Sequence, residues 1–146
     1  MKVIPKLRDA ATKQSIRISD GTILKTTNGG TSWSKLNSGT TQHLLTVHFP
    51  VDANTGYIGG YVSTLLKTTN GGQTWTPLTI NGGYVYDIVF PQNANTGYVS
   101  AIDGSQDYIY KTTNGGLNWV QVLYLEDAFI QSMSFPLDDQ TGYVAN

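Results

Sequence analysis

The 146-residue sequence contains no cysteine, which excludes disulfides, thiolate metal ligands and cysteine nucleophiles. Charged residues are scarce at 13% of the chain, against the ~25% of a typical soluble domain. Only two are arginines, Arg8 and Arg17, and no basic stripe is present, which excludes nucleic acid as a partner. No run approaches the ~18 apolar residues of a membrane span, and residues 1–18 are too charged for a signal-peptide core.

Two motifs recur along the chain at nearly constant spacing. A box of nine residues, Lys-Thr-Thr-Asn-Gly-Gly-x-x-Trp, begins at Lys25, Lys67 and Lys111. A second motif, Phe-Pro followed after four residues by Thr-Gly-Tyr, begins at Phe49, Phe90 and Phe135. Self-similarity with a period of about 40 to 45 residues indicates a repeat protein.

Within one period, four short runs rich in β-branched and aromatic residues predict strands over 44–49, 56–62, 64–69 and 74–79. The turn sequences Asn-Thr-Gly and Asn-Gly-Gly join these strands and predict antiparallel hairpins in a meander. Four short strands per repeat are typical of one blade of a β-propeller. The expected fold class is therefore all-β, with four-stranded antiparallel blades.

The repeat divides the chain into two complete blades and two half blades. With strands named A to D from the inside outwards, strands C and D fall in 19–43, complete blades in 44–83 and 84–128, and strands A and B in 129–146. Residues 1–18 lie outside the repeat, as a leader, a tag or an added strand at 15–18. Joining residue 146 to residue 19 would give Tyr143 and Lys25 the spacing that separates Tyr57 from Lys67, so the halves are complementary.

Three blades are fewer than the about four to eight of a closed propeller. An open array would leave unpaired strand edges at both ends. The preferred hypothesis is a homodimer whose six blades close into a ring around a two-fold axis. The alternative is a fragment of a longer propeller, excised or engineered, with no activity of its own.

The boxes resemble the Asp-box of the bacterial-neuraminidase-repeat superfamily, Ser/Thr-x-Asp-x-Gly-x-Thr-Trp, with Asn in place of Asp. The matching positions are Thr26, Asn28, Gly30 and Trp33, then Thr68, Asn70, Gly72 and Trp75, then Thr112, Asn114, Gly116 and Trp119. The third copy departs at Asn118, where the pattern has Thr. With the Thr-Gly-Tyr turns, residues 19–146 resemble photosystem II stability/assembly-factor-like repeats, which implies a binding or assembly scaffold and an exported protein. Sialidases, xyloglucanases and sortilin-type receptors carry similar blades, so the resemblance specifies fold better than function.

We expect the box residues to be structural. The Asn side chain should accept hydrogen bonds from backbone N–H groups two or three residues on, and the Gly pair should supply positive φ. Trp75, on strand D, should pack between blades. No helix is expected after the Asn-Gly-Gly turn and no Gly-Lys-Thr follows it, so the box is not a phosphate-binding loop.

Residue counts argue against an enzyme. Sialidase chemistry would use three arginines and a Tyr/Glu pair, whereas the chain has two Arg and one Glu. A xyloglucanase-like hydrolase would use two flanking carboxylates, for which the candidates are Asp87, Asp103, Asp107, Glu126 and Asp127. For all of these but Asp87, the simpler interpretation is a solvated loop.

Strand A lines the channel of a propeller, so Asp87 is expected to face water or an ion, most simply as a carboxylate solvated at the channel mouth. His43 and His48 would point to opposite faces of one strand and form a poor metal pair, so no metal or cofactor is expected.

Variation among the repeats separates two rims. The A–B and C–D turns share one rim and repeat almost letter for letter, whereas the B–C and D–A loops share the other and differ, at 34–42, 77–83, 102–107 and 121–128. This variable rim also holds Tyr61. With Asp87 added, the candidate binding residues are Tyr84, Asp87, Asp103, Asp107, Tyr108, Tyr124, Glu126 and Asp127. Loops of this composition suit a protein or glycan ligand. The preferred function is a non-catalytic binding scaffold, and the alternative is a glycan-active hydrolase fragment.

Overall fold

A computed structural model describes residues 7–8, 15–16 and 21–146, and every regular element among them is a β-strand. The prediction of an all-β fold is confirmed. Strands β1 (Leu7–Arg8) and β2 (Ser15–Ile16) form a separate antiparallel pair. The rest of residues 1–18, which we interpret as a leader or a tag, lies outside the described residues. The described part of the chain has no helix with the length and apolarity needed to cross a bilayer.

Two four-stranded antiparallel sheets make up the middle of the chain. The first consists of β5 (Leu44–His48), β6 (Gly56–Gly60), β7 (Leu65–Thr68) and β8 (Thr76–Pro77). The second consists of β9 (Tyr84–Val89), β10 (Gly97–Asp103), β11 (Gln106–Thr112) and β12 (Val120–Glu126). Each strand pairs with its neighbour in sequence, so both sheets are the meanders that the turn sequences predict.

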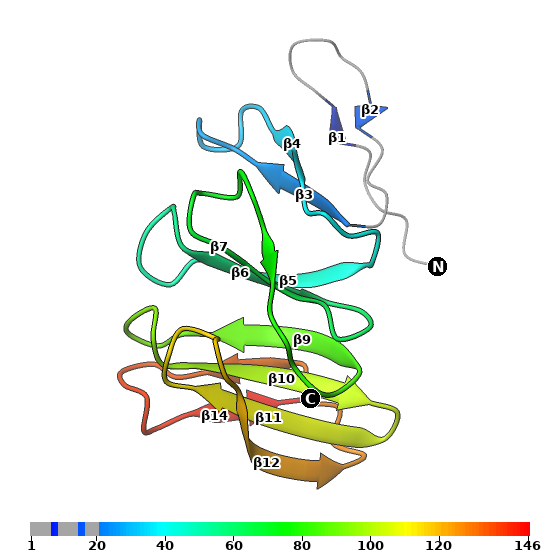
Figure 1. Cartoon of the computed structure of the whole chain (residues 1–146), viewed down its shortest axis with the longest axis vertical. Coiled ribbons are helices and arrows are strands. Elements are labelled where there is room, and N and C mark those ends of the chain that lie inside the picture. The colour runs from blue at the N-terminus through cyan, green and yellow to red at the C-terminus, as the bar shows by residue number, and fades with distance from the viewer. Residues whose placement is uncertain (1–6, 9–14, 17–20) are drawn as a thin grey trace.

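Two smaller sheets flank the middle pair in sequence. Strands β3 (Thr22–Lys25) and β4 (Ser34–Asn37) precede it, and β13 (Ser132–Ser134) and β14 (Tyr143–Ala145) follow it. Figure 1 shows β3–β4, β5–β8 and β9–β12 following one another along the long axis of the molecule. Face-to-face stacking of small sheets is the packing of propeller blades.

The core lies between consecutive sheets, because neither face of such a sheet is shielded by the sheet itself. One buried cluster joins the sheet of β5–β8 to that of β9–β12, with members Tyr57, Leu65, Ile80, Val85, Ile88, Phe90, Val99, Ala101 and Tyr110. A second cluster joins β9–β12 to the last hairpin, with members Tyr98, Ile109, Ile130 and Met133. The two faces of β10 and β11 therefore serve different neighbours, as alternation along a strand requires.

The prediction of loops at 102–107 and 121–128 is largely wrong. Strands β10 and β11 leave only residues 104–105 as a turn, and β12 continues to Glu126, which pairs with Gln106. The additional residues of this repeat therefore lengthen a hairpin. Cross-strand pairing satisfies their backbone N–H and C=O groups, which an irregular loop would leave to water.

Candidate functional site

The box is a closed hydrogen-bonded turn between strands C and D. Thr68 Oγ1 accepts from the backbone N–H groups of Asn70 at 3.3 Å and Gly72 at 3.0 Å. Asn70 Oδ1 accepts from the Thr74 N–H at 3.0 Å, and Asn70 Nδ2 donates to Thr74 Oγ1 at 2.8 Å. Gly71 and Gly72 both have positive φ, 68° and 84°. This conformation brings Thr74, four residues after Asn70, back to the asparagine side chain.

This geometry corrects the expected asparagine contacts. The Asn70 side-chain oxygen accepts from the N–H four residues on, and the Gly72 N–H, two residues after Asn70, donates instead to the threonine hydroxyl. Trp75 immediately precedes β8, whereas we had placed it on strand D. Its ring meets Phe49 edge-on at 6.3 Å, and Trp119 packs against the core cluster between the two middle sheets.

The three boxes differ in the residue that precedes the tryptophan and contacts the asparagine side chain. In the first, Asn28 bonds to both the N–H and the hydroxyl of Ser32, each at 2.9 Å. In the third, Asn118 replaces the hydroxyl residue, and only its N–H contacts Asn114 Oδ1, at 3.0 Å, within the described part of the chain. All three boxes therefore use their side chains to hold their own turns.

Asp107 is the most buried carboxylate of the predicted set, with 1% of its surface exposed. It lies on β11, and its oxygens accept from the backbone N–H groups of Ala128 at 3.1 Å, Phe129 at 3.0 Å and Ile130 at 2.8 Å. The prediction of a solvated loop is wrong for this residue. Its carboxylate fixes the chain that enters the last hairpin, because three donors converge on it.

Asp87 connects strand A of three successive repeats. Its Oδ2 accepts from the Met133 N–H at 2.7 Å, and its Oδ1 accepts from its neighbour Ile88 N–H at 2.9 Å and, at 3.5 Å, from the Thr46 hydroxyl. We expected a solvated carboxylate or an ion ligand. The side chain is half-buried and bonded to protein donors, which gives it a structural role.

His43, which immediately precedes β5, and His48, the last residue of β5, have different surroundings. His43 lies 5.2 Å from the Tyr61 ring, whereas His48 stacks on Phe90 and its Nε2 accepts from the Phe90 N–H at 3.2 Å. Burial lowers the pKa of His48, although the nearby Asp87 carboxylate acts in the opposite direction. Among the described residues, no three His, Asp or Glu side chains come together in a possible metal site.

Tyrosines form two groups on the variable rim. Tyr61 and Tyr84, from consecutive repeats, stack with their centroids 4.4 Å apart, and Tyr86 meets Tyr84 edge-on at 6.4 Å. Burial, together with the other two tyrosines, raises the pKa of Tyr86. Tyr84 stays 40% exposed, so this stack presents an aromatic surface that spans a boundary between sheets.

The second group lies on the long β11–β12 hairpin. Tyr108 and Tyr124 are cross-strand partners with centroids 5.5 Å apart. The Tyr124 hydroxyl donates to Glu126 Oε1 at 2.8 Å, and this bond raises the pKa of Tyr124. Asp103, Glu126 and Asp127 are all exposed nearby in sequence. Of the predicted tyrosines, Tyr84 and Tyr124 are therefore exposed, whereas Tyr108 is partly buried and packs against the core cluster between the two middle sheets.

The rim also carries two exposed apolar residues that sequence reasoning missed. Val62 is 66% exposed with φ of 54°, and Phe129 is 49% exposed with φ of 52°. A β-branched residue at positive φ is strained, and such strain often accompanies functional surfaces. Ser63 stabilises the turn that contains Val62, because its N–H donates to the Gly83 carbonyl and its hydroxyl donates to the Gly82 carbonyl. Nothing in the sequence signals either left-handed residue.

The profile of a family described as photosynthesis system II assembly factor YCF48 matches residues 25–129, more than two thirds of the sequence. The chain belongs to this family. No protein with a curated description matches significantly.

Solved structures similar to this chain include two of YCF48 and one of an enzyme. YCF48 bound to D1 peptide is 26% identical, with a TM-score of 0.54 over 66% of this chain and 31% of that chain. An ancestral GH74 enzyme is 26% identical, with a TM-score of 0.59 over 71% of this chain and 15% of that chain. YCF48 from Cyanidioschyzon merolae has a TM-score of 0.70 over 97% of this chain and 47% of that chain, and at 18% identity it supports the fold alone. The chain spans less than half the length of each of these three.

Proposed function

We propose that the chain is a non-catalytic propeller scaffold that binds an extended segment of a protein partner on its variable rim. The observation that carries the proposal is the Tyr61–Tyr84 stack, which joins two repeats and leaves an aromatic surface open beside the strained Val62. Tyrosine offers a rigid apolar ring with a polar hydroxyl, a combination enriched at protein interfaces. A family relative was solved with a bound peptide, which supports the same class of ligand here.

The charge of the rim favours a basic segment. Its loops at 38–43, 61–64, 78–84, 103–106 and 124–131 contain no Lys or Arg. They contain Asp103, Glu126 and Asp127, whose side chains are all exposed. Lysine and arginine side chains can pair with such carboxylates and can also lie over tyrosine faces.

Fluorescence anisotropy with labelled peptides tests the proposal. The probes are a D1 peptide, a lysine-rich peptide and a glutamate-rich peptide of equal length. We expect the lysine-rich peptide to bind more tightly than the glutamate-rich one, and Tyr61→Ala or Tyr84→Ala to weaken binding at least about tenfold. Leu117→Ala, an exposed change in the box on the opposite rim, is the matched control. Equal affinity of the parent chain and the tyrosine variants for every peptide would contradict the proposal.

A glycan-active hydrolase is the second candidate, and the ancestral GH74 enzyme among the similar structures favours it. Against it, Asp87 and Asp107 are occupied by backbone donors, which leaves Asp103, Glu126 and Asp127 as the exposed carboxylates of the predicted set, and Glu126 already accepts from the Tyr124 hydroxyl. Incubation with xyloglucan separates the two functions. Release of reducing sugar that is lost in Glu126→Gln would establish the hydrolase, whereas xyloglucan binding without turnover would identify a glycan-binding scaffold.

The finer features of the scaffold are also proposals. A ring of six blades, built from two copies of the chain, would double the variable rim and place the two tyrosine surfaces symmetrically. Export from the cell stays a prediction of the family resemblance.

A further inference from the structure

The dipeptide Asn-Gly occurs at four places in the chain, each time followed by a second glycine. The backbone nitrogen of such a glycine can attack the asparagine side chain, because glycine carries no side chain that hinders the approach. The reaction converts asparagine to aspartate or isoaspartate. All four asparagines are exposed, so neither the local sequence nor exposure separates them. They are Asn28, Asn70, Asn81 and Asn114.

In the second box, hydrogen bonds hold both groups that would react. The Asn70 side chain is bound to Thr74 through Oδ1 at 3.0 Å and Nδ2 at 2.8 Å. The Gly71 N–H, which carries the attacking nitrogen, donates to the Asn54 carbonyl at 2.9 Å. The Gly71 carbonyl accepts from Lys25 Nζ at 2.8 Å. The turn must therefore open before the ring can form.

The third box repeats these restraints. Asn114 Oδ1 accepts from the Asn118 N–H at 3.0 Å. The Gly115 N–H donates to the Asn95 carbonyl at 2.9 Å, and the Gly115 carbonyl accepts from Lys67 Nζ at 2.8 Å. The reacting groups of this pair are therefore held from both sides.

The first box holds its asparagine through the side chain. Asn28 Oδ1 accepts from the Ser32 N–H at 2.9 Å and from the Thr26 hydroxyl at 3.0 Å, and Nδ2 donates to Ser32 Oγ at 2.9 Å. These three bonds must break before the carboxamide can turn toward the following glycine.

Asn81 has none of these restraints. It lies in the loop between β8 and β9, which connects the two complete four-stranded sheets. Within the described part of the chain, its side chain forms no hydrogen bond and the Gly82 N–H has no acceptor. The carboxamide is therefore free to rotate toward the Gly82 nitrogen.

We propose that Asn81 is the site at which the folded chain deamidates, whereas the box asparagines are protected. Hydroxide removes the Gly82 N–H proton, and the nitrogen attacks Asn81 Cγ to close a succinimide ring. The side-chain amide group leaves as ammonia after taking a proton from water, which regenerates the hydroxide. Water then opens the ring on either side, giving aspartate or isoaspartate. The chemistry consumes only water.

Isoaspartate would lengthen the backbone by a methylene group just before two glycines that anchor the neighbouring turn. The Gly82 and Gly83 carbonyls accept from the hydroxyl and the N–H of Ser63. A Cβ on Gly82 would lie 3.4 Å from the Ala101 Cβ and 3.5 Å from the Tyr108 ring, so Gly82 has little room to shift. The modification therefore disturbs the contact between residues 61–64 and the loop before β9.

Peptide mapping by mass spectrometry is the first test, on the full chain incubated at mildly alkaline pH in buffer and in urea. In urea all four asparagines should deamidate at similar rates, because Gly-Gly follows each of them. In buffer, Asn81 should stay within about threefold of its rate in urea. The box asparagines should be at least about tenfold slower than in urea. An Asn81 as protected as the boxes, or a box asparagine as fast as Asn81 in the folded chain, would overturn the proposal.

An isoaspartyl methyltransferase provides a second readout, because it methylates isoaspartate and leaves aspartate unmodified. The incubated parent chain should accept methyl groups. Asn81→Gln should accept almost none, because glutamine would have to form a larger ring, which closes far more slowly. Asn28→Gln is the matched control, since it removes a protected Asn-Gly pair and should accept as much as the parent. Equal methylation of Asn81→Gln and the parent would contradict the assignment.

The effect on ligand binding rests on the function proposed for the rim. The incubated parent should bind the lysine-rich peptide more weakly than the fresh parent, whereas Asn81→Gln should keep its affinity. Absence of peptide binding by the fresh chain would refute the rim function alone, because the peptide map decides the modification independently. Unchanged affinity after conversion of most of Asn81 would refute the link between this loop and the Tyr61–Tyr84 surface.

Discussion

The carboxylate of Asp107 accepts a hydrogen bond from the backbone N–H of Ile130 at 2.8 Å, and both residues are buried. The contact ties β11 of one repeat to the start of the next repeat. Ile130 contributes to the second core cluster, so the position of this backbone decides whether the last hairpin packs.

Asp107→Asn should destabilise the fold by about 2 to 3 kcal/mol, because the amide nitrogen would face backbone N–H donors that the carboxylate now satisfies. Urea denaturation measures this loss. Asp103→Asn, an exposed acid four residues earlier, should change the free energy of unfolding by less than about 0.5 kcal/mol. Equal effects for the two variants would show that Asp107 does not anchor the loop.

Asn118→Thr should stabilise the protein by about 0.5 kcal/mol, because it restores the hydroxyl that Asn114 Nδ2 lacks in the third box. The reverse change in the second box, Thr74→Asn, should cost a similar amount, because Asn70 then loses its side-chain partner. Thermal unfolding of both variants checks the pair. The idea fails if the two substitutions shift the melting temperature in the same direction.

Gly97→Ala should destabilise by about 2 kcal/mol, because a Cβ there would lie 2.5 Å from the Phe90 ring. The conformation of Gly97 is not the cause, because its φ is not positive. Gly104→Asn provides the contrast. Gly104 has φ of 64° with open space around it, and asparagine tolerates this conformation, so the cost should stay below about 0.5 kcal/mol. A larger cost at Gly104 than at Gly97 would contradict the steric explanation.

Stability should fall as the pH drops from about 6.5, because burial holds the pKa of His48 below its value in the unfolded chain. Protonation then favours the unfolded state. The contribution of His48 is complete above pH 6.5 and disappears as the pH falls through the lower folded pKa. His48→Gln should flatten this part of a curve of unfolding free energy against pH. An unchanged slope between pH 7 and 5 would exclude His48 as its source.

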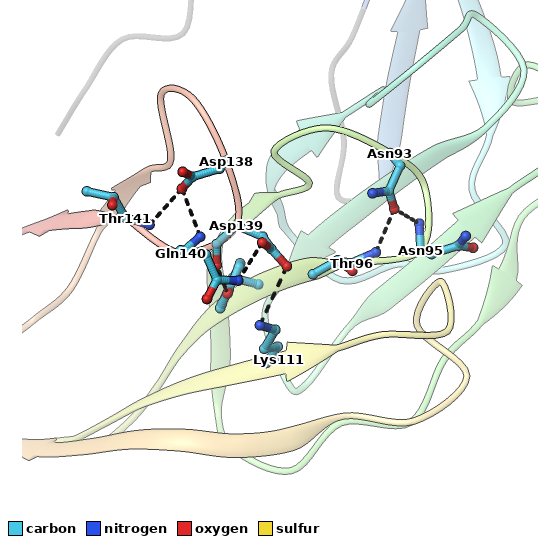
Figure 2. Close-up of polar contacts among 9 residues, drawn as sticks. Asn93, Asn95, Thr96, Lys111, Asp138, Asp139, Gln140 and Thr141 are labelled. Carbon is cyan, nitrogen blue, oxygen red and sulfur yellow. Dashed lines mark hydrogen bonds and ion pairs between the residues drawn. The ribbon is translucent and has the colours of Figure 1, made fainter.

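Below about pH 4, two other groups should contribute to the pH dependence. Backbone N–H donors lower the pKa of Asp52 and of Asp138, so each contributes stability above its unfolded pKa that is lost as the pH falls through the folded value. Asn93 occupies the equivalent position in the remaining repeat and accepts from the Asn95 and Thr96 N–H groups (Figure 2). Asp52→Asn and Asp138→Asn should therefore keep the turns and remove only the acid-induced loss, measured by urea titration at pH 3 and 5.

The repeated residues explain why so much of the fold is predictable from sequence. Phe49, Phe90 and Phe135 mark the same strand end three times, and the boxes mark the same turn, so period and strand order follow directly. The role of the Thr-Gly-Tyr glycine was not predictable in this way. Its spacing suggests a tight turn, whereas in the folded chain a phenylalanine ring lies directly against it.

The candidate site was less predictable, because carboxylates look alike in sequence. Asp103 and Asp107 flank the same turn, yet one is exposed and the other accepts three backbone bonds. Whether a carboxylate is buried depends on the hydrogen-bond donors that the following segment places beside it. For Asp107 these donors are backbone N–H groups, which leave no signal in the sequence. The Tyr61–Tyr84 stack likewise depends on the angle between two sheets.

The lysine-to-carbonyl contact has a direction, from Lys25 to Gly71 and from Lys67 to Gly115, always toward the later repeat. Each repeat thus has a donor face, which carries the lysine, and an acceptor face, which carries the box carbonyl. A repeat that keeps both groups can make this contact with the repeat on either side. A tandem duplication of residues 44–83 would keep this contact, because Lys67 of the first copy would face the Gly71 carbonyl of the second. Duplication of a repeat therefore preserves the contact between adjacent sheets. The angle between adjacent sheets then limits the number of blades.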